Sequence, residues 1–423
     1  MRLCLVASKP TDSVIHGFLP AAARLGLDVV LLTDRPAEHE RARARARAMP
    51  RPGCLPHGEG RLAHPAPVRV LDCDVWHARQ LIGAIASSPA PDAIFSNSDH
   101  LQAQTALAAA YFGLPGKDWR SSMRAKNKPL MRRRLAQTGI EQVATAELRP
   151  GAGPPPGGLA YPLVLKPSEG VASEDVVLVS SPDELRMRSE QIFARRPGAT
   201  LLAEEYLPGP LRTVETLGDG AVTWVLGGFR TRLSPPPFFI EERLTWDAPV
   251  PEAAREHVLG ALTALGAGFG ACHTEYIDTG GGPTLIDVND RLIGDDCDFI
   301  LGDLLGVDLF ERVLRVHLGE PLPPGPPPAP GPDRAHAVID YVVADRAGVL
   351  SAAPDAGAQR SGEPGVLLAY RPLREAGDRI ALTHTNRDYL GVITAIGPDP
   401  DAVELSVAAL RAGRNWEITD GVW

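Results

Sequence analysis

The chain has 423 residues, of which 44% are hydrophobic and 22% are charged, a composition typical of a folded globular protein and unlike that of a disordered one. Its 43 Lys and Arg against 52 Asp and Glu give a net charge of -9, which excludes the globally positive surface that binds nucleic acid or an anionic membrane. A chain of this length is expected to form about three domains.

The first hundred residues predict a parallel sheet with crossover helices, because short apolar runs alternate with helical patterns. The turn after the first run, at residues 8–12, lacks the GxGxxG motif and therefore argues against an NAD site. The RARARARA run from Arg41 to Ala48 is interpreted as a solvated helix face. The apolar runs are Leu3–Ala7, Asp28–Leu32, Val68–Leu71 and Asp92–Phe95.

No run approaches the roughly 20 apolar residues of a membrane span, and residues 1–13 do not resemble a signal peptide. We therefore expect a cytoplasmic protein that does not insert into a membrane. The five cysteines form no CxxC pair, which favours reduced thiols over a structural zinc site. They are Cys4, Cys54, Cys73, Cys272 and Cys297.

A strand is expected over Tyr161–Lys166, and it leads into the small-residue loop Pro167–Ser173. A lysine at a strand end followed by such a loop is a candidate phosphate cradle, made of backbone amides and one ammonium group. Further on, residues 201–209 read as a strand that opens into a connection. Proline-rich stretches at 149–158 and 322–332 predict extended connections.

The most informative segment is residues 272–296, which predict one strand ending at Glu275–Ile277, a glycine turn and a second strand over Pro283–Val288. Asp287 and Asn289 share a face of the second strand, and the turn folds Glu275 back opposite them. Hard oxygen ligands of this kind suit Mg²⁺. Arg291 continues the same face and could bind a phosphoryl or carboxylate group through two hydrogen bonds.

After the proline-rich stretch at 322–332, apolar alternation and glycine turns predict a small antiparallel sheet, followed by a helix over Asp399–Arg411. Its strands are expected at Ala337–Val343, Gly365–Tyr370 and Gly391–Ile396.

Four motifs in this order resemble the ATP-grasp superfamily, specifically its carboxylate-amine ligases, which include amino-acid (dipeptide) ligases and siderophore-type ligases. They are the Lys128–Arg132 helix start, the Lys166 strand, the EEYLPG segment and the HTE and DVNDRL pair, and together they extend from about Pro91 to the C-terminus. The resemblance implies an α/β fold of the α+β ATP-grasp type, with an N-terminal parallel α/β domain, a two-lobed ATP-grasp core and a small C-terminal antiparallel sheet domain. The implied boundaries are 1–120 for the N-terminal domain, 121–330 for the ATP-grasp core and 331–423 for the C-terminal domain. The core is divided near residue 210 into a nucleotide-binding lobe and a metal-binding lobe.

The resemblance also implies the roles of individual residues. Catalysis falls to Lys166 and Arg291, and the first ATP lysine is either Lys126 or Lys128, with Lys128 preferred. The implied ATP-binding residues are Lys128, Lys166, Ser173, Glu204, Glu205, Tyr206, Leu207 and Glu215; the substrate-binding residues are Asp99, Arg291, Gly294 and Asp295; and the metal ligands are Glu275, Asp287 and Asn289. His273 is interpreted as structural.

The implied activity is ATP-dependent amide formation through an acylphosphate, with ATP and Mg²⁺ (or Mn²⁺) as cofactors and a small carboxylic acid and an amine as substrates. No nucleic acid is expected as a partner, and a homodimer is left open. Two alternatives remain, an ATP-grasp carboxylase and a degenerate nucleotide-binding protein. The second arises because residues 170–175 are poor in glycine, because Glu174 and Asp175 add negative charge, and because Asp287 stands where the family usually has Glu.

One substrate is expected to carry a positive amine or several polar groups, because Asp295 follows Arg291 by four residues and a carboxylate pairs well with a cation. The alternative is that Asp295 caps the helix that starts near Cys297.

Overall fold

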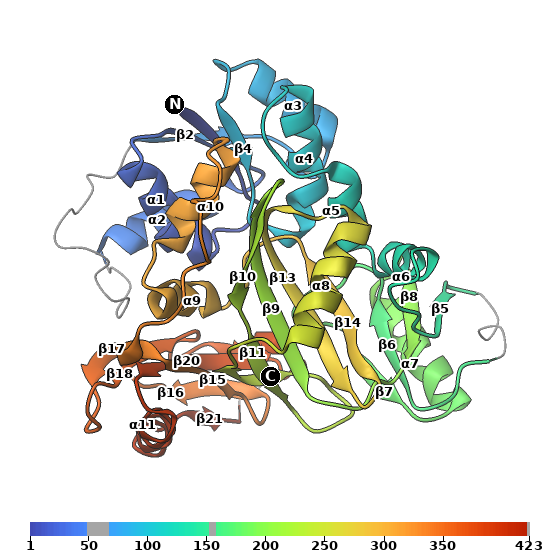
Figure 1. Cartoon of the computed structure of the whole chain (residues 1–423). Helices are drawn as coiled ribbons and strands as arrows, with labels where there is room; N and C mark the ends of the chain where they lie inside the picture. Colours follow the sequence, from blue (N-terminus) through green and yellow to red (C-terminus); the bar gives the residue numbers. More distant parts are fainter. Residues whose placement is uncertain (49–66, 152–157, 421–423) are drawn as a thin grey trace.

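The computed structural model describes residues 1–48, 67–151 and 158–420. Cys54 and most of the proline-rich stretch at 149–158 lie outside these ranges. The described chain forms four β-sheets with helices packed against them (Figure 1). Within the described ranges, no helix has both the length and the apolar character that a membrane crossing requires.

The N-terminal sheet is parallel, as predicted, with the strand order β3-β2-β1-β4. Its strands are β1 (Arg2–Val6), β2 (Asp28–Thr33), β3 (Val68–Asp72) and β4 (Ala93–Phe95). The helices of this region are α1 (Leu19–Arg24), α2 (Pro36–Ala48), α3 (Ala78–Ala86), α4 (Gln102–Tyr111) and α5 (Trp119–Lys126). The chain adds β2 and β3 on one side of β1 and β4 on the other, so the strand order reverses between β1 and β4. In open α/β sheets ligands bind at the carboxyl ends of the strands at such a point.

A four-stranded antiparallel sheet, ordered β5-β8-β6-β7, forms a separate lobe that is green in Figure 1. It contains β5 (Thr145–Leu148), β6 (Leu163–Pro167), β7 (Val177–Val179), β8 (Leu201–Glu205) and α7 (Pro182–Arg195), and α6 (Lys128–Gln137) precedes it. Helix α6 begins at Lys128 because the Asn127 side chain accepts a hydrogen bond from the Leu130 amide at 3.1 Å and Pro129 occupies the first turn. Lys128 therefore enters the structure at a fixed helix start.

The central sheet has ten strands, with β14-β13-β9-β11-β12 at one end and β10 paired to β9. These strands are β9 (Leu211–Asp219), β10 (Thr223–Gly227), β11 (Phe229–Leu233), β12 (Glu241–Trp246), β13 (Phe269–Thr279) and β14 (Gly282–Asn289). Helix α8 (Glu252–Leu265) packs beside β14, and α9 (Cys297–Leu305) and α10 (Leu309–His317) lie toward the N-terminal sheet (Figure 1).

The C-terminal strands are antiparallel, as predicted, but most of them continue the central sheet through the pairing of β12 with β15. They are β15 (His336–Val343), β18 (Leu367–Pro372), β20 (Tyr389–Gly397) and β17 (Gly357–Arg360). A small three-stranded sheet of β16 (Gly348–Ala352), β19 (Arg379–Ile380) and β21 (Glu417–Thr419) accompanies them, together with α11 (Pro400–Ala412). The division at residues 120 and 330 stays a proposal.

One hydrophobic core joins the N-terminal sheet to the central sheet. Phe18 packs against Phe95 of β4 and Phe310 of α10, with ring centroids 4.6 and 5.0 Å apart. Buried aromatic pairs of this kind stabilise an interface beyond their area alone. The Leu292 amide, shortly after β14, also donates to the side chain of Asn97, just after β4, at 3.1 Å. The carboxyl end of β4 is thereby joined to the end of the β13–β14 hairpin.

Candidate active site

A cavity of about 560 Å³ lies where the N-terminal sheet, the antiparallel lobe and the central sheet meet. This volume is in the range of small-molecule sites. All the site residues predicted from the sequence line it except Glu215. The fold therefore brings together side chains that are nearly 200 positions apart in the chain, from Asp99 to Asp295.

The β13–β14 hairpin places Glu275 directly opposite Asp287 and His273 opposite Asn289. The register shifts by one residue between Glu275 and Tyr276, so Ile286 forms a bulge in β14. Without this bulge Glu275 would face Ile286 and Asp287 would project from the other side of the sheet, because side chains alternate between faces. The Asn289 amide lies 3.4 Å from the Glu275 carboxylate.

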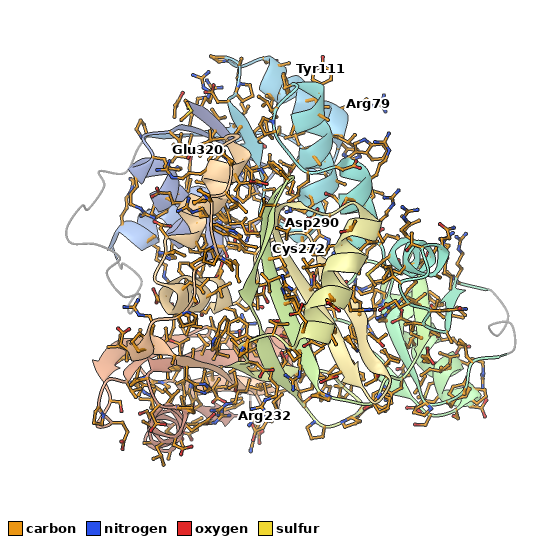
Figure 2. The ribbon with its side chains drawn as sticks, viewed as in Figure 1. Arg79, Tyr111, Arg232, Cys272, Asp290 and Glu320 are labelled. Carbon is orange, nitrogen blue, oxygen red and sulfur yellow. The ribbon has the colours of Figure 1, made fainter. Side chains whose placement is uncertain are left out.

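The end of β14 is anchored by Asp290, the residue between Asn289 and Arg291. Its carboxylate accepts hydrogen bonds of 2.6 Å from both Lys117 Nζ and Ser122 Oγ, so it ties β14 to α5. In Figure 2, Asp290 and Cys272 lie in the interior, whereas Tyr111 lies at the surface. Cys4, Cys73, Cys272 and Cys297, the cysteines among the described residues, are all unpaired.

Lys128 and Lys166 both line the cavity. Lys128 Nζ lies 2.9 Å from the Asp287 carboxylate, and Lys166 of β6 forms an ion pair with Glu204 of β8. Lys126, the alternative first lysine, pairs with Asp99 and does not line the cavity. Lys128 thus takes the position on the cavity wall, next to the carboxylates of the hairpin.

Glu204 is held by two cations, since Arg132 Nε also donates to it at 2.6 Å. Burial by itself would raise the pKa of Glu204, but Arg132 and Lys166 outweigh it and lower the pKa to about 2. For Lys166 burial has the opposite effect and lowers the pKa, and the neighbouring positive charges of Arg132 and Lys128 lower it further. Glu204 is one of the implied ATP-binding residues, and in the structure its buried carboxylate fixes the position of Lys166.

Residues 205–207 continue from β8 along the cavity wall. The Glu205 backbone pairs with Ala144, and its carboxylate accepts a hydrogen bond of 2.8 Å from the Ala144 amide. The Tyr206 amide donates to the Pro162 carbonyl at 3.3 Å. Tyr206 and Leu207 are thus held next to the cavity by backbone hydrogen bonds to the lobe.

The loop after β6, residues 168–176, adopts left-handed backbone conformations at Ala172, Ser173 and Asp175, with φ angles of 55°, 54° and 59°. Ser173 lines the cavity, whereas Glu174 and Asp175 do not. Arg196 forms ion pairs of 2.8 Å with both of these acids, and Arg195 and Arg387 pair with one each. The two negative charges that argued for a degenerate site are therefore neutralised outside the cavity.

Glu215 differs from expectation, because it lies one strand behind the cavity wall and does not line it. Its carboxylate is 2.7 Å from His273 Nδ1, and His273 Nε2 is 3.3 Å from Glu275. Burial alone would lower the pKa of His273, but Glu215 and Glu275 raise it to about 10. A charged His273 between two carboxylates fits the structural role expected for it.

The substrate end of the cavity is formed by the residues after β14 and by the loop after β4. Arg291 Nε lies 4.0 Å from the Asp99 carboxylate, and its guanidinium donates to the Leu292 carbonyl at 2.8 Å. Gly294 and Asp295 follow along the same wall, and the Asp295 carbonyl accepts a 2.6 Å hydrogen bond from Tyr341.

Several cavity residues were not found by the sequence analysis, namely Asp12, Glu241, Arg371, Asn386 and Arg387. They lie on separate segments of the chain, and no short motif includes them. Three of them belong to the C-terminal part of the chain, which the sequence predicts to be a separate domain: Arg371 lies in β18, and Asn386 and Arg387 lie in the turn before β20.

The described residues contain no group of three or more His, Cys, Asp or Glu side chains arranged to hold a metal ion. The hairpin instead offers two carboxylates and one amide oxygen, from Glu275, Asp287 and Asn289. Mg²⁺ commonly takes one or two carboxylates and completes its shell with water and substrate phosphates. The position of Lys128 Nζ against Asp287 also indicates that this carboxylate faces positive charge. The donor set fits Mg²⁺.

No protein-family model matches the chain. Over its whole length it resembles solved structures, including an L-amino acid ligase from Bacillus licheniformis with a TM-score of 0.74, 21% identity and 99% of both chains covered. The chain has the ATP-grasp fold. Another ATP-grasp structure, a biotin carboxylase from Campylobacter jejuni in complex with β-γ-ATP, gives a TM-score of 0.66 at 13% identity and covers 99% of this chain and 92% of its own.

Among curated relatives, the uncharacterised protein y4rH of Sinorhizobium fredii is 25% identical over 99% of this ATP-grasp chain and 84% of its own. Carnosine synthase 1 of Gallus gallus is 27% identical over 72% of this chain, and dapdiamide A synthase of Enterobacter agglomerans is 24% identical over 46%. The matched parts make up 36% and 48% of those two proteins.

Proposed function

We propose that this protein is an ATP-dependent carboxylate-amine ligase that forms an amide bond through an acylphosphate and releases ADP and phosphate. The observation that carries the proposal is the placement of Lys128, Lys166 and the Glu275–Asp287 pair around one cavity in an ATP-grasp fold. Sequence relatives that are named as synthases, carnosine synthase and dapdiamide A synthase, support the same class.

In this proposal ATP binds between the lobe and the central sheet. Lys128, Lys166 and Ser173 bind its phosphates, Glu204–Leu207 border the base, and Glu275, Asp287 and Asn289 hold Mg²⁺, for which Mn²⁺ could substitute. When bound, the metal ion neutralises charge on the transferring phosphoryl group. Glu215 does not line the cavity and affects this site through its ion pair with His273.

The acid binds near Arg291 and Asp99. One of its carboxylate oxygens attacks the terminal phosphorus of ATP, which forms the acylphosphate and releases ADP. A neutral amine then attacks the acyl carbon, so that a C–N bond forms, phosphate leaves and one proton is released. Arg291 and Lys166 stabilise negative charge on the transferring and leaving oxygens, and no protein nucleophile is required.

A second class, an ATP-grasp carboxylase, is favoured by one observation, the similarity to biotin carboxylases in overall structure. In that reaction bicarbonate replaces the organic acid. A cytoplasmic location, a homodimeric state and the use of small molecules as substrates are further parts of the proposal.

The decisive experiment is a matrix of acids against amines with Mg-ATP, in which phosphate release and product mass are measured. We expect phosphate release that depends on both an acid and an amine. The mass of the product should equal the mass of the acid plus that of the amine, less one water. Asp287→Asn should lower turnover by more than tenfold, because it removes a negative charge that faces the metal. Phosphate release that requires bicarbonate alone would indicate a carboxylase, and ATP binding without turnover would indicate a nucleotide-binding protein.

A further inference from the structure

A loop from the C-terminal part of the chain, residues 383–388, contacts the 168–176 loop beside the cavity. The Asn386 backbone N–H donates to the Ala172 carbonyl at 3.1 Å, and Arg387 forms an ion pair with Glu174. Asn386 and Arg387 also line the cavity. The two loops are more than 200 residues apart in sequence.

The 168–176 loop requires support from its surroundings. Left-handed backbone is unfavourable for a non-glycine residue, and this loop has three such residues. Its internal hydrogen bonds are few, from the Glu174 amide to Val171 at 3.1 Å and from the Val176 amide to Ser173 at 3.3 Å. A glycine-rich loop would adopt the same conformation without this cost.

The 383–388 loop, in contrast, has a dense set of internal hydrogen bonds. The Asp388 carboxylate accepts from the Thr383 amide at 2.9 Å, from the Thr383 hydroxyl at 2.7 Å and from the His384 amide at 2.6 Å. The His384 ring stacks on Phe238 at 4.2 Å between centroids. This loop can therefore act as a preformed support.

Asn386 connects the support to the central sheet. Its side-chain oxygen accepts from the Glu241 amide at 3.1 Å, and its side-chain nitrogen lies 3.2 Å from the Glu241 carboxylate. Asn386 is 9% exposed, whereas the Arg387 side chain is 49% exposed. We therefore expect Asn386 to contribute more than Arg387, since exposed ion pairs are weak.

The contact also sets the charge beside the cavity. Burial raises the pKa of Glu174, but hydrogen bonds from Arg387 and Arg196 outweigh it and lower the pKa. Glu174 and Asp175 lie next to Arg195, Arg196 and Arg387, and the formal charges of these five side chains sum to one positive charge. An anionic ligand at Ser173 meets no net repulsion from them.

We propose that Asn386 and Arg387 are positioning residues for the triphosphate: they hold the 168–176 loop in the conformation that binds the nucleotide phosphates, so the C-terminal strands complete the ATP site. This inference rests on the proposed function in that the ligand is Mg-ATP. It explains how a phosphate-binding loop can be poor in glycine.

The test uses the full chain and needs no knowledge of the acid or the amine. Hydrogen exchange of peptides covering residues 168–176 reports the order of the loop, and calorimetry with Mg-ATP reports affinity. Asn386→Ala removes the side-chain hydrogen bonds to Glu241 that hold the 383–388 loop in place, and the backbone hydrogen bond to Ala172 loses that support. We therefore expect this variant to speed exchange in these peptides and to raise the Kd for Mg-ATP about tenfold. Arg387→Ala should raise the Kd about threefold, and Arg387→Lys should recover part of that loss.

Arg346→Ala is the matched control, because Arg346 makes an exposed ion pair with its neighbour Asp345 in the same part of the chain. Unchanged exchange at 168–176 in Asn386→Ala would overturn the positioning role. Faster exchange with an unchanged Kd would overturn its link to the nucleotide, as would a parent chain that binds no Mg-ATP. The variants could change loop exchange and the Kd for Mg-ATP as expected while the parent shows no phosphate release that depends on an acid and an amine. That result would overturn only the ligase assignment.

If the substrates are then identified, the variants should raise the KM for ATP and leave the KM values of the acid and the amine unchanged. A purely structural defect would lower the activity at saturating ATP as well.

Discussion

Asp295 presents a carboxylate to the cavity without a hydrogen bond or ion pair from any described side chain. The residue that immediately precedes α9 is Asp296, whose carboxylate pairs with Arg371, so the position next to the helix belongs to Asp296 and not to Asp295. Asp295 also has a left-handed φ of 53°, an uncommon conformation for a non-glycine residue that clusters at ligand sites. These features favour contact with a substrate over helix capping.

We therefore expect Asp295→Asn and Asp295→Leu to lower kcat/KM for cationic amines about tenfold or more, with unchanged affinity for ATP. Kinetics with a pair of amines that differ only in a second positive charge provide the measurement. A matched loss of thermal stability in both variants, with no change in amine preference, would instead support a cap.

Glu204 carries a prediction about pH. Its pKa is lowered from 4.5 to about 2 in the folded chain, where Arg132 and Lys166 outweigh burial. A lowered pKa means that the ion pairs stabilise the fold above pH 4.5 and that this stability is lost as the pH falls toward 2. The shift in pKa corresponds to a contribution of roughly 3 kcal/mol to the free energy of unfolding.

Urea unfolding between pH 6 and pH 3 tests this. In Glu204→Gln the free energy of unfolding should fall less steeply with decreasing pH than in the parent, although its value at pH 7 is lower because Lys166 loses its partner. Glu205→Gln is the control: the Glu205 carboxylate accepts a hydrogen bond from the Ala144 amide and pairs with no cation among the described residues, so this variant should keep the slope of the parent. Equal slopes in Glu204→Gln and the parent would contradict the assignment.

At the scale of elements, the active site depends on how β14 is held against α5. Lys117 and Asp290 are buried, with side chains 6% and 5% exposed, and Ser122 completes the group. Removing one partner of a buried ion pair leaves the other charge without compensation, which costs about 3–5 kcal/mol.

Lys117→Met should therefore lower the free energy of unfolding by about 3 kcal/mol. Arg120→Ala, which removes an exposed ion pair at the start of α5, three residues further along the chain, should change it by less than about 0.5 kcal/mol. Chemical denaturation of both variants checks the difference. Similar small effects in the two variants would show that the tie between α5 and β14 is not important for stability.

At the scale of the whole molecule, the central sheet runs from the hairpin to the C-terminal strands without a break. Leu244 of β12 pairs with Ile339 of β15, and Arg243 reaches Asp340 at 3.3 Å. Asp340 is buried and also pairs with Arg411 of α11. The C-terminal strands are thus part of one structural unit with the hairpin.

A chain that ends at residue 330 should accordingly fail to unfold cooperatively, because β12 would become an unpaired sheet edge and the buried residues behind it would be exposed. Size-exclusion chromatography and urea unfolding of this chain are the measurements. A monomeric fragment with a cooperative transition would contradict this expectation and would support a domain boundary at 330.

The sequence by itself determined the parallel N-terminal sheet, the helix start at Lys128, the strand at Lys166 and the β13–β14 hairpin. These features depend on local signals such as apolar alternation, a cap followed by proline, and a glycine turn. The face shared by Asp287 and Asn289 follows from strand geometry alone. The site residues implied by the resemblance to ATP-grasp ligases, apart from Glu215, surround one cavity.

Only the tertiary structure decided the rest. The bulge at Ile286 that aligns Glu275 with Asp287 results from pairing across the hairpin and has no sequence signature. Three other features depend on contacts between segments far apart in the chain. Arginines neutralise Glu174 and Asp175, Glu215 pairs with His273 outside the cavity, and Asn386 contacts Ala172. A charged residue looks the same in sequence whether it faces solvent, a ligand or a distant arginine, because its partner is chosen by packing.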